Sequence, residues 1–498
     1  MPPSPERTLR QRALRSLAGL AVPFLLLAIP GPEGEPPPAP ARGGSFAWNR
    51  DAFWADLEAR FVTLRDHGCP ATGPETAAGV AGLRARIDRL GDERVTAGSA
   101  SLDSLEAAFF ELAPRVAACP DSLDAYVALQ ASLRAAVKDQ SHDWDVTQSG
   151  ARERLYRLLY GSRAAVEEVI LVHPSSVPAL QAGVDEPSAT PSAVVGGVRV
   201  HSGDLLVSRG GYPTSALIAR GNDFPGNFSH VALVHVDSAT GAASAIEAHI
   251  ERGVAIATAE QYLADKKLRI LVLRPRADLP ALRADPLLPH RAATAALERA
   301  RREHIPYDFA MDYTDDARLF CSEVASSVYR QAGVTLWTGL STISAPGLRR
   351  WLGGFGVRHF ETQEPSDLEY DPQLVVVAEW RDPGALQADH VDNAVIDAML
   401  EGAEAGDRLT YPWYQLPVVR LAKGWSLFRE LLGGTGPVPQ GMSARAALRN
   451  RAFDLRQRRI AAEVNDRIAV MERDQGYPLP YWAILNLARE ATRLHPPA

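Results

Sequence analysis

The hydrophobic pattern of this chain changes its period once, near residue 198, and that change limits the available folds more than any other feature. From Phe53 to Val172 apolar side chains recur every three or four residues, in five stripes separated by short breaks. Stripes of this kind are typical of amphipathic helices, so we expect an antiparallel helical bundle over 44–172. Residues 173–197 are rich in Pro, Ser and Gly and are predicted to be a linker.

After this segment, short β-branched runs bounded by Gly, Asp and Pro replace the helical stripes, as in strands. The runs are 198–207, 228–236, 243–250 and 268–273. Helical stretches interleave with them, and one, 321–332, ends at Gly333, a favourable helix terminator. The mixture predicts an α+β domain with an antiparallel sheet over 198–355, followed by a mostly helical C-terminal extension over 356–498.

The composition excludes several classes of protein. Hydrophobic residues make up 46% of the chain and charged residues 23%, which are ordinary values for a globular protein rather than a disordered one. Lys and Arg number 53 against 60 Asp and Glu. No surplus of cations is therefore present for a nucleic-acid partner. Three cysteines exclude a Cys-rich zinc or iron–sulfur framework, and we predict no cofactor.

The first 43 residues have the pattern of an export signal followed by a Pro-rich segment. Four arginines, the last of them Arg15, precede the apolar stretch 17–29. That stretch is shorter than the roughly 20 apolar residues of a membrane span. Ala39-Pro40-Ala41 offers a cleavage site. We expect export to the periplasm or cell envelope, with the segment either removed or retained as an N-terminal membrane anchor.

Export changes how the cysteines are interpreted. Cys69 and Cys119 each precede a proline and flank helical stripes of the same region. In an oxidising envelope they are disulfide candidates, closing a loop that stabilises the fold by about 3–4 kcal/mol. The alternative is two buried free thiols. In either case Cys321 is left unpaired.

His230, Glu247 and Cys321 are the residues with catalytic potential. A four-residue turn over 237–240 would place His230 directly opposite Glu247, on the same face and about 5 Å apart at Cβ. A loop one residue longer would separate them onto opposite faces. A carboxylate at this position can accept a proton from one imidazole nitrogen and fix the tautomer of the ring.

Cys321 stands at the predicted start of a helix. Unpaired N–H groups and the helix dipole stabilise a thiolate there, and a nearby imidazolium would lower the pKa of the thiol further. Such a thiolate is a nucleophile for acyl transfer, with histidine as base and acid. Each residue also has an ordinary structural interpretation, because a cysteine is often a small core residue, a strand histidine is usually hydrogen-bonded, and a glutamate is usually on the surface.

Five short blocks resemble the permuted papain-like cysteine hydrolases, the YiiX/YaeF-like branch of the NlpC-type superfamily. The blocks are SGDLLVSRG at 202–210, FSHVALVH at 228–235, IEA at 246–248, PYDF at 306–309 and FCSEV at 320–324. In that family the papain-type order is circularly permuted, so that the histidine strand precedes the cysteine helix. The resemblance covers about a third of the chain, and neither the helical bundle nor the C-terminal extension belongs to the family core.

The resemblance implies roles for individual residues. Cys321 resembles the nucleophile, His230 the general base, and Glu247 the residue that orients the imidazole. Tyr307 resembles an aromatic side chain near the substrate. From spacing alone, His249 or Glu251 could replace Glu247 as the orienting partner, whereas His235 should lie on the other face of its strand. A zinc site built from His230, Glu247, His249 and Cys321 is a further alternative, although no paired-ligand spacing favours it.

These features predict an exported cysteine hydrolase, of the amidase or peptidase kind, that cleaves an amide or related acyl bond through a thioacyl-enzyme. The family suggests small peptides, peptidoglycan stem peptides, amino-acyl or γ-glutamyl amides, or N-acyl lipids as substrates. A lipid acyltransferase is an alternative because an alcohol or amine could capture the same intermediate. A catalytically silent binding module of the cell envelope is the alternative outside enzymes.

Overall fold

The computed structural model describes residues 27–29, 44–48 and 50–497. Most of the predicted export signal therefore lies outside the described residues, and its role stays a prediction. Within the described ranges, no helix combines the length and the apolar character that crossing a membrane requires.

The N-terminal region is a bundle of five helices, as its hydrophobic stripes predict. They are α2 (Asp51–His67), α3 (Cys69–Asp92), α4 (Ala100–Ala118), α5 (Leu123–Ser141) and α6 (Ser149–Val172). The stripe residues Leu102, Tyr126 and Leu155 are completely buried, because each helix turns its apolar face toward the others. Cys69 at the start of α3 and Cys119 at the end of α4 form a disulfide, with their Cα atoms 4.9 Å apart.

The central layer is a seven-stranded sheet in which every pair of neighbours is antiparallel. The strand order is β1-β11-β8-β4-β5-β6-β7. The strands are β1 (Leu180–Ala182), β4 (Leu205–Gly210), β5 (His230–Val236), β6 (Ala243–His249), β7 (Gly253–Thr258), β8 (Lys267–Pro275) and β11 (Leu374–Arg381). The prediction of an α+β domain with an antiparallel sheet is confirmed.

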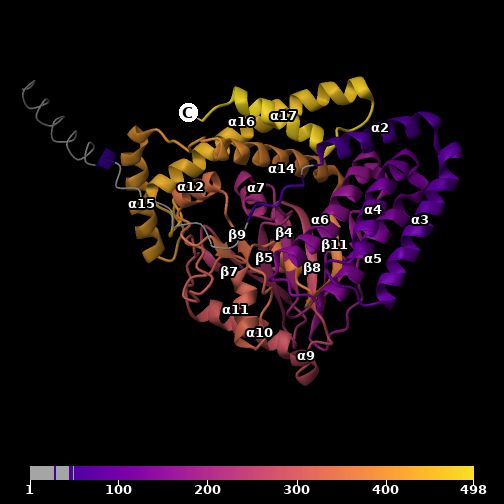
Figure 1. Ribbon diagram of the computed structural model, residues 1–498. Helices are drawn as coiled ribbons and strands as arrows, with labels where there is room; N and C mark the ends of the chain where they lie inside the picture. The colour runs from indigo at the N-terminus through magenta and orange to yellow at the C-terminus, as the bar shows by residue number, and fades with distance from the viewer. Residues whose placement is uncertain (1–26, 30–43, 49, 498) are drawn as a thin grey trace, which may run out of the picture.

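The two faces of the sheet bury different apolar sets, following the period of two along each strand. On one face, Leu205, Leu233 and Leu271 join a core that also contains the bundle helices, α10 (Leu288–Arg302) and α11 (Glu323–Gln331). On the other face, Leu206 and Val234 join a smaller core. In Figure 1 the bundle lies to the right of the sheet, and α10 and α11 lie below the sheet.

The segment 173–197 is not a simple linker, contrary to the prediction. It supplies β1, which forms the edge of the main sheet beside β11, and β2 (Ser192–Val195), which pairs with β3 (Val198–His201). The short apolar runs in this segment become strands because partner strands elsewhere in the fold satisfy their backbone groups, a contribution that local composition does not reveal.

The sheet also extends beyond the predicted boundary at residue 355, because β11 lies between β1 and β8. The remaining C-terminal region is mostly helical, as predicted. Its main helices are α12 (Pro346–Phe355), α14 (Pro383–Glu404), α15 (Leu416–Leu431), α16 (Ala444–Gln475) and α17 (Tyr481–Leu494). Four of them, α12, α14, α16 and α17, share a separate apolar core. Figure 1 shows these helices on the side of the molecule opposite α10.

Candidate active site

His230, the first residue of β5, and Glu247, in β6, make a direct contact. The Nε2 atom of His230 lies 2.6 Å from Oε2 of Glu247, a length typical of charge-assisted hydrogen bonds. The side chain of His230 is 21% exposed, whereas that of Glu247 is 5% exposed. Solvent and substrate can therefore reach the imidazole while the carboxylate that holds it stays shielded.

The strand register that produces this contact differs from the predicted one. Val236 pairs with Ala243 rather than with Gly241, and Ala232, not His230, is the partner of Glu247. The register is thus shifted by two residues. Because side chains alternate faces with a period of two, this even shift keeps His230 and Glu247 on one face, where they meet diagonally.

The loop between β5 and β6 is longer than predicted because Asp237 organises it. The carboxylate of Asp237 accepts hydrogen bonds from the backbone N–H groups of Ala239 and Thr240. Gly241 then adopts a φ of 73°, which favours glycine, and its N–H donates to the carbonyl oxygen of Asp237. These bonds close a turn over 237–242 in place of the expected four-residue turn.

Glu247 has a second histidine partner. The Nε2 atom of His249 lies 3.2 Å from Oε1 of Glu247, and the rings of His230 and His249 are 5.7 Å apart between centroids. Burial alone would raise the pKa of Glu247, but the hydrogen bonds from both histidines lower it well below its usual range. The carboxylate therefore stays ionised at all working pH values and can hold two imidazoles at once.

The other histidine and glutamate considered from spacing lie elsewhere. His235 is buried on β5 and stacks on His290, with the ring centroids 5.4 Å apart. Glu251 is exposed in the turn after β6. His249 and Glu251 were the two alternatives to Glu247 named from the sequence. Only His249 lies in the site, where it contacts Glu247 and does not replace it.

Cys321 lies beside the backbone that carries His230. Helix α11 begins at Glu323, two residues later than predicted, so that Cys321 lies in the turn before the helix. The thiol donates to the carbonyl oxygen of Ser229, with a sulfur–oxygen distance of 3.8 Å. Among the described residues, no hydrogen bond joins Sγ to the His230 ring. The sulfur is thus hydrogen-bonded to the peptide group that joins Ser229 to His230, and not to the His230 ring.

The pKa of Cys321 is raised to about 12, mainly by burial and next by the charge of Glu364. The predicted lowering of this pKa is therefore wrong for this arrangement. The backbone N–H groups of Val231, Ser322 and Cys321 do favour the thiolate, as expected of a helix start. Their effect is smaller than the loss of hydration of the thiolate in a residue that is only 3% exposed.

Tyr307 and Glu364 complete the surroundings of the thiol. Tyr307 forms a bridge with Leu319, which brings it close to Cys321, and burial and the cysteine charge raise the pKa of its hydroxyl well above its usual range. Glu364 is buried, and burial together with Asp367 raises its pKa well above the ordinary value. No sequence pattern indicated Glu364, which lies in the predicted C-terminal extension.

We expect Cys321 to react slowly with iodoacetamide at neutral pH and faster only as the pH rises toward its raised pKa, because the thiolate is the nucleophile. Glu364→Gln should shift this reactivity to lower pH, since glutamine cannot acquire the charge that opposes the thiolate. A pH series of labelling rates, followed by mass spectrometry, measures both. Rapid wild-type labelling near pH 6 would contradict the raised pKa.

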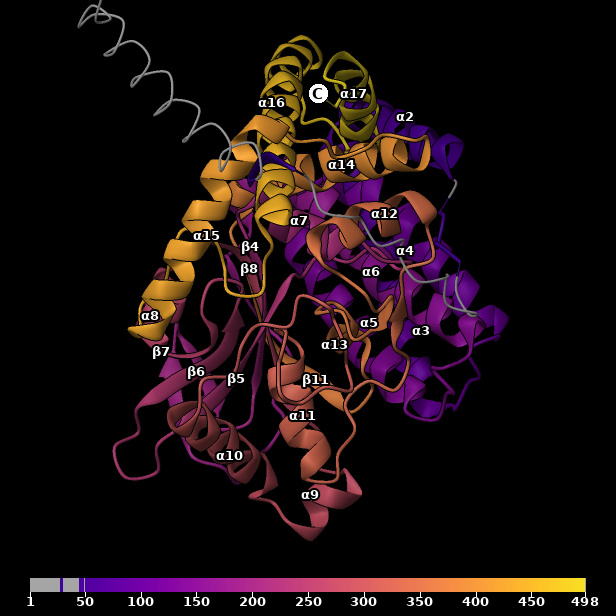
Figure 2. The same cartoon turned by 90° about the vertical axis from the view of Figure 1, so that its left-hand side faces the viewer.

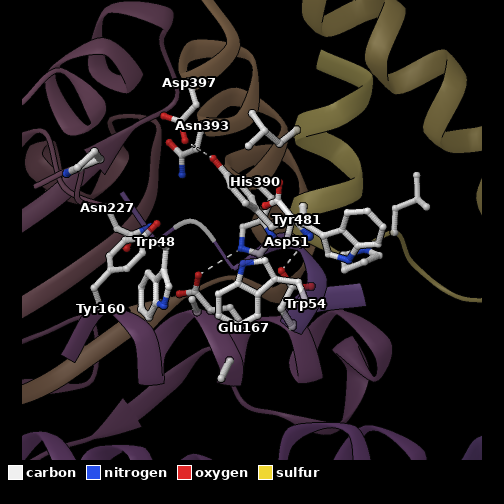
Figure 3. Close-up of a pocket in the computed structure, with 18 of the residues that line it drawn as sticks. Trp48, Asp51, Trp54, Tyr160, Glu167, Asn227, His390, Asn393, Asp397 and Tyr481 are labelled. Atoms are coloured by element: carbon white, nitrogen blue, oxygen red, sulfur yellow. Dashed lines mark hydrogen bonds and ion pairs between the residues drawn. The ribbon is translucent and has the colours of Figure 1, made fainter. Parts of the chain in front are cut away.

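A large cavity among the described residues lies away from this site. It has a volume of about 650 Å³ and is enclosed by α2, α4 and α6 on one side and α14 and α17 on the other. Figure 3 shows its aromatic walls, which include Trp48, Trp54, Tyr160 and Tyr481. The imidazole of His390 points to Glu167, at 3.3 Å. Cys321, His230 and Glu247 do not line this cavity.

Comparison with known proteins identifies the central domain. Residues 199–378 match a family described as permuted papain-like amidase enzyme, YaeF/YiiX, C92 family. A crystal structure described as metalloprotein yiiX from Escherichia coli O157:H7 is 20% identical, with a TM-score of 0.27, and the match covers 35% of this chain and 95% of that chain. No curated protein matches the chain. The permuted papain-like prediction is confirmed for this domain, which is an enzyme domain of the cysteine amidase kind.

Proposed function

We propose that the protein is an exported cysteine amidase in which Cys321 is the nucleophile, His230 the general base and acid, and Glu247 the residue that positions His230. The observation that carries this assignment is the 2.6 Å contact between His230 and Glu247, next to Ser229, whose carbonyl oxygen accepts from the Cys321 thiol. Because Glu247 occupies Nε2 of the ring, Nδ1 is the nitrogen that remains for proton transfer.

The reaction begins from the neutral thiol that the buried position favours. Nδ1 of His230 takes the proton of Cys321 while Sγ attacks the carbonyl carbon of the amide. The resulting oxyanion is stabilised by the backbone N–H groups at the start of α11. His230 then gives the proton to the leaving nitrogen, which departs as an amine and leaves a thioester on Cys321.

The second half returns the enzyme to its resting state. His230 removes a proton from water, the water oxygen attacks the thioester, and the carboxylic acid leaves as Sγ regains its proton. Capture of the thioester by an alcohol or amine in place of water would give the acyltransferase outcome. The exposed face of His230 admits either acceptor, so the ratio of hydrolysis to transfer depends on which acceptor is present.

Glu247→Gln should lower kcat by about 10²–10⁴-fold while changing KM little, because an amide cannot stabilise the imidazolium and leaves the ring free to turn. His249→Gln is the matched control, since it removes the other neighbour of the same carboxylate and should cost less than about tenfold. Steady-state kinetics on a panel of small amides measures both variants. Equal losses in the two variants would remove the special role of the His230–Glu247 pair.

The experiment that tests the function itself is a trapping measurement. An amide or ester substrate mixed with the wild-type protein and quenched in acid should leave an acyl group on Cys321, detectable in the peptide that contains it. If the protein is instead a catalytically silent binding module, no substrate of the panel should leave an acyl adduct on Cys321.

A further inference from the structure

Helix α15 exposes an apolar stripe that no other described element covers. The stripe consists of Val418, Leu421, Trp425, Phe428 and Leu432, whose exposed fractions are 62%, 65%, 54%, 51% and 70%. Their spacing of three and four residues places them on one face of the helix. Figures 1 and 2 both show α15 at the outer edge of the molecule. An exposed patch of this size and order marks a binding surface.

The opposite face of α15 is firmly attached to the protein. Val419 and Ala422 pack in one apolar cluster with Ile250 and Phe309. Ser426 is completely buried, and its hydroxyl accepts a hydrogen bond from the backbone N–H of Val438 at 3.0 Å. The helix is therefore held in place with its apolar stripe directed outward.

We propose that this stripe docks into the surface of a lipid bilayer. Trp425 and Phe428, with Trp413 and Tyr414 just before the helix, are 51–60% exposed, and aromatic side chains of this kind favour the boundary between headgroups and acyl chains. The helix carries three cations and one anion, namely Arg420, Lys423, Arg429 and Glu430. This surplus of positive charge complements anionic headgroups.

A second observation places α15 beside Leu27, one of the described residues of the apolar N-terminal stretch. The guanidinium of Arg420 donates to the carbonyl oxygen of Leu27 at 2.7 Å, near the end of that stretch. The described end of an apolar stretch therefore contacts α15, and this suits a surface that docks into a bilayer. A second copy of the chain is a poorer occupant, because a two-fold contact through α15 would bring the same cations of both copies together.

The position of α15 connects the surface to the candidate active site. Ile250 follows His249 directly, and Phe309 packs against Tyr307, with the ring centroids 5.1 Å apart. Both Ile250 and Phe309 pack against the same apolar cluster, Val438, Met442 and Ala446, as the inner face of α15 does. Resting on the proposed amidase function, this placement indicates substrates with an acyl chain that reach Cys321 from the bilayer rather than from solution.

Position-specific labelling tests the docking. In a Cys321→Ser background, an environment-sensitive fluorophore is attached at Leu421→Cys or, as the matched control, at Leu455→Cys on α16, where the leucine is 46% exposed. Vesicles of phosphatidylcholine and phosphatidylglycerol should shift the emission at 421 to shorter wavelength and allow quenching by brominated lipid. Position 455 should change little, even if the N-terminal segment also holds the protein on the vesicle.

Three outcomes of the labelling would count against all or part of the docking proposal. An unchanged emission at 421 overturns the proposal. A short-wavelength emission at 421 before vesicles are added shows that protein already covers the stripe, whether a second copy or the chain's own N-terminal residues, and also overturns it. A shift with phosphatidylcholine alone that is as large as with phosphatidylglycerol keeps the docking but removes the role assigned to the cations.

A kinetic comparison separates the docking from the function. Leu421→Ser with Trp425→Ser, in the otherwise unchanged chain, should weaken vesicle partitioning by roughly tenfold for each apolar side chain lost. The variant should lose hydrolysis of a vesicle-embedded N-acyl amide and keep hydrolysis of a short soluble amide. If wild-type protein cleaves neither amide, the proposed function fails while the labelling result stands. If the variant cleaves both as well as wild type, the membrane route to the site is wrong.

Discussion

Replacing Cys321 with serine should reduce turnover of any amide substrate by about 10⁴-fold or more, because a serine hydroxyl is far less acidic and less nucleophilic than a thiol. The fold should be preserved. The thiol donates a weak hydrogen bond to the carbonyl oxygen of Ser229, and a hydroxyl can donate to the same oxygen. Single-turnover kinetics and a thermal unfolding midpoint measure the two effects on the same preparation.

Ser327→Ala offers a control in the same helix. Its hydroxyl is buried in α11 without a partner among the described residues, so its removal should leave both activity and stability close to wild type. A Cys321→Ser variant that kept activity within tenfold of wild type, beside a silent control, would show that the hydrolysis does not pass through a thioester on this residue.

Replacing Arg163 with methionine should lower the free energy of unfolding by about 3–5 kcal/mol, the cost of leaving a buried charge without its partner. Arg163, on α6, is completely buried. It donates to Glu369 at 2.6 Å and to Glu379 at 3.3 Å. In the variant Glu379 still pairs with Arg134 at 2.7 Å. Glu369 is therefore the carboxylate that loses its ion-pair partner. Denaturant unfolding followed by tryptophan fluorescence measures the change.

Two further variants make this result specific. Arg60→Met removes an exposed i,i+4 pair with Asp56 and should change stability by no more than about 0.5 kcal/mol. Removing the orphaned carboxylate as well, with Arg163→Met and Glu369→Leu together, should recover part of the loss. A single Arg163→Met variant as stable as Arg60→Met would mean that the bundle and the sheet do not depend on this ion pair.

The sequence predicted the kinds of element well because these depend on periodicity. The five helical stripes and the main strand runs each carry their own signal. The contact between His230 and Glu247 was predicted for a wrong register, and it survived only because the actual register differs by an even number of residues. A pattern of alternating residues cannot distinguish two registers that present the same face.

The properties of Cys321 could not be derived in this way. Its helix start and its histidine neighbour are visible in the chain, and both favour a lowered pKa. Its burial and the proximity of Glu364, 43 residues later, arise only when the C-terminal part folds back over the site. The segment 173–197 was misjudged for a related reason, because the partner that makes β1 a strand lies almost two hundred residues away, in β11.

The place of β11 between β1 and β8 also affects the order in which the protein can be completed during synthesis. Strand β8 ends at Pro275 and β11 begins at Leu374, so a growing chain carries unpaired edges on both β1 and β8 for about a hundred residues of translation. Open edges of this kind readily accept strands of other chains. Nascent and prematurely terminated forms that end before Leu374 would therefore depend on chaperones, and the finished enzyme would not.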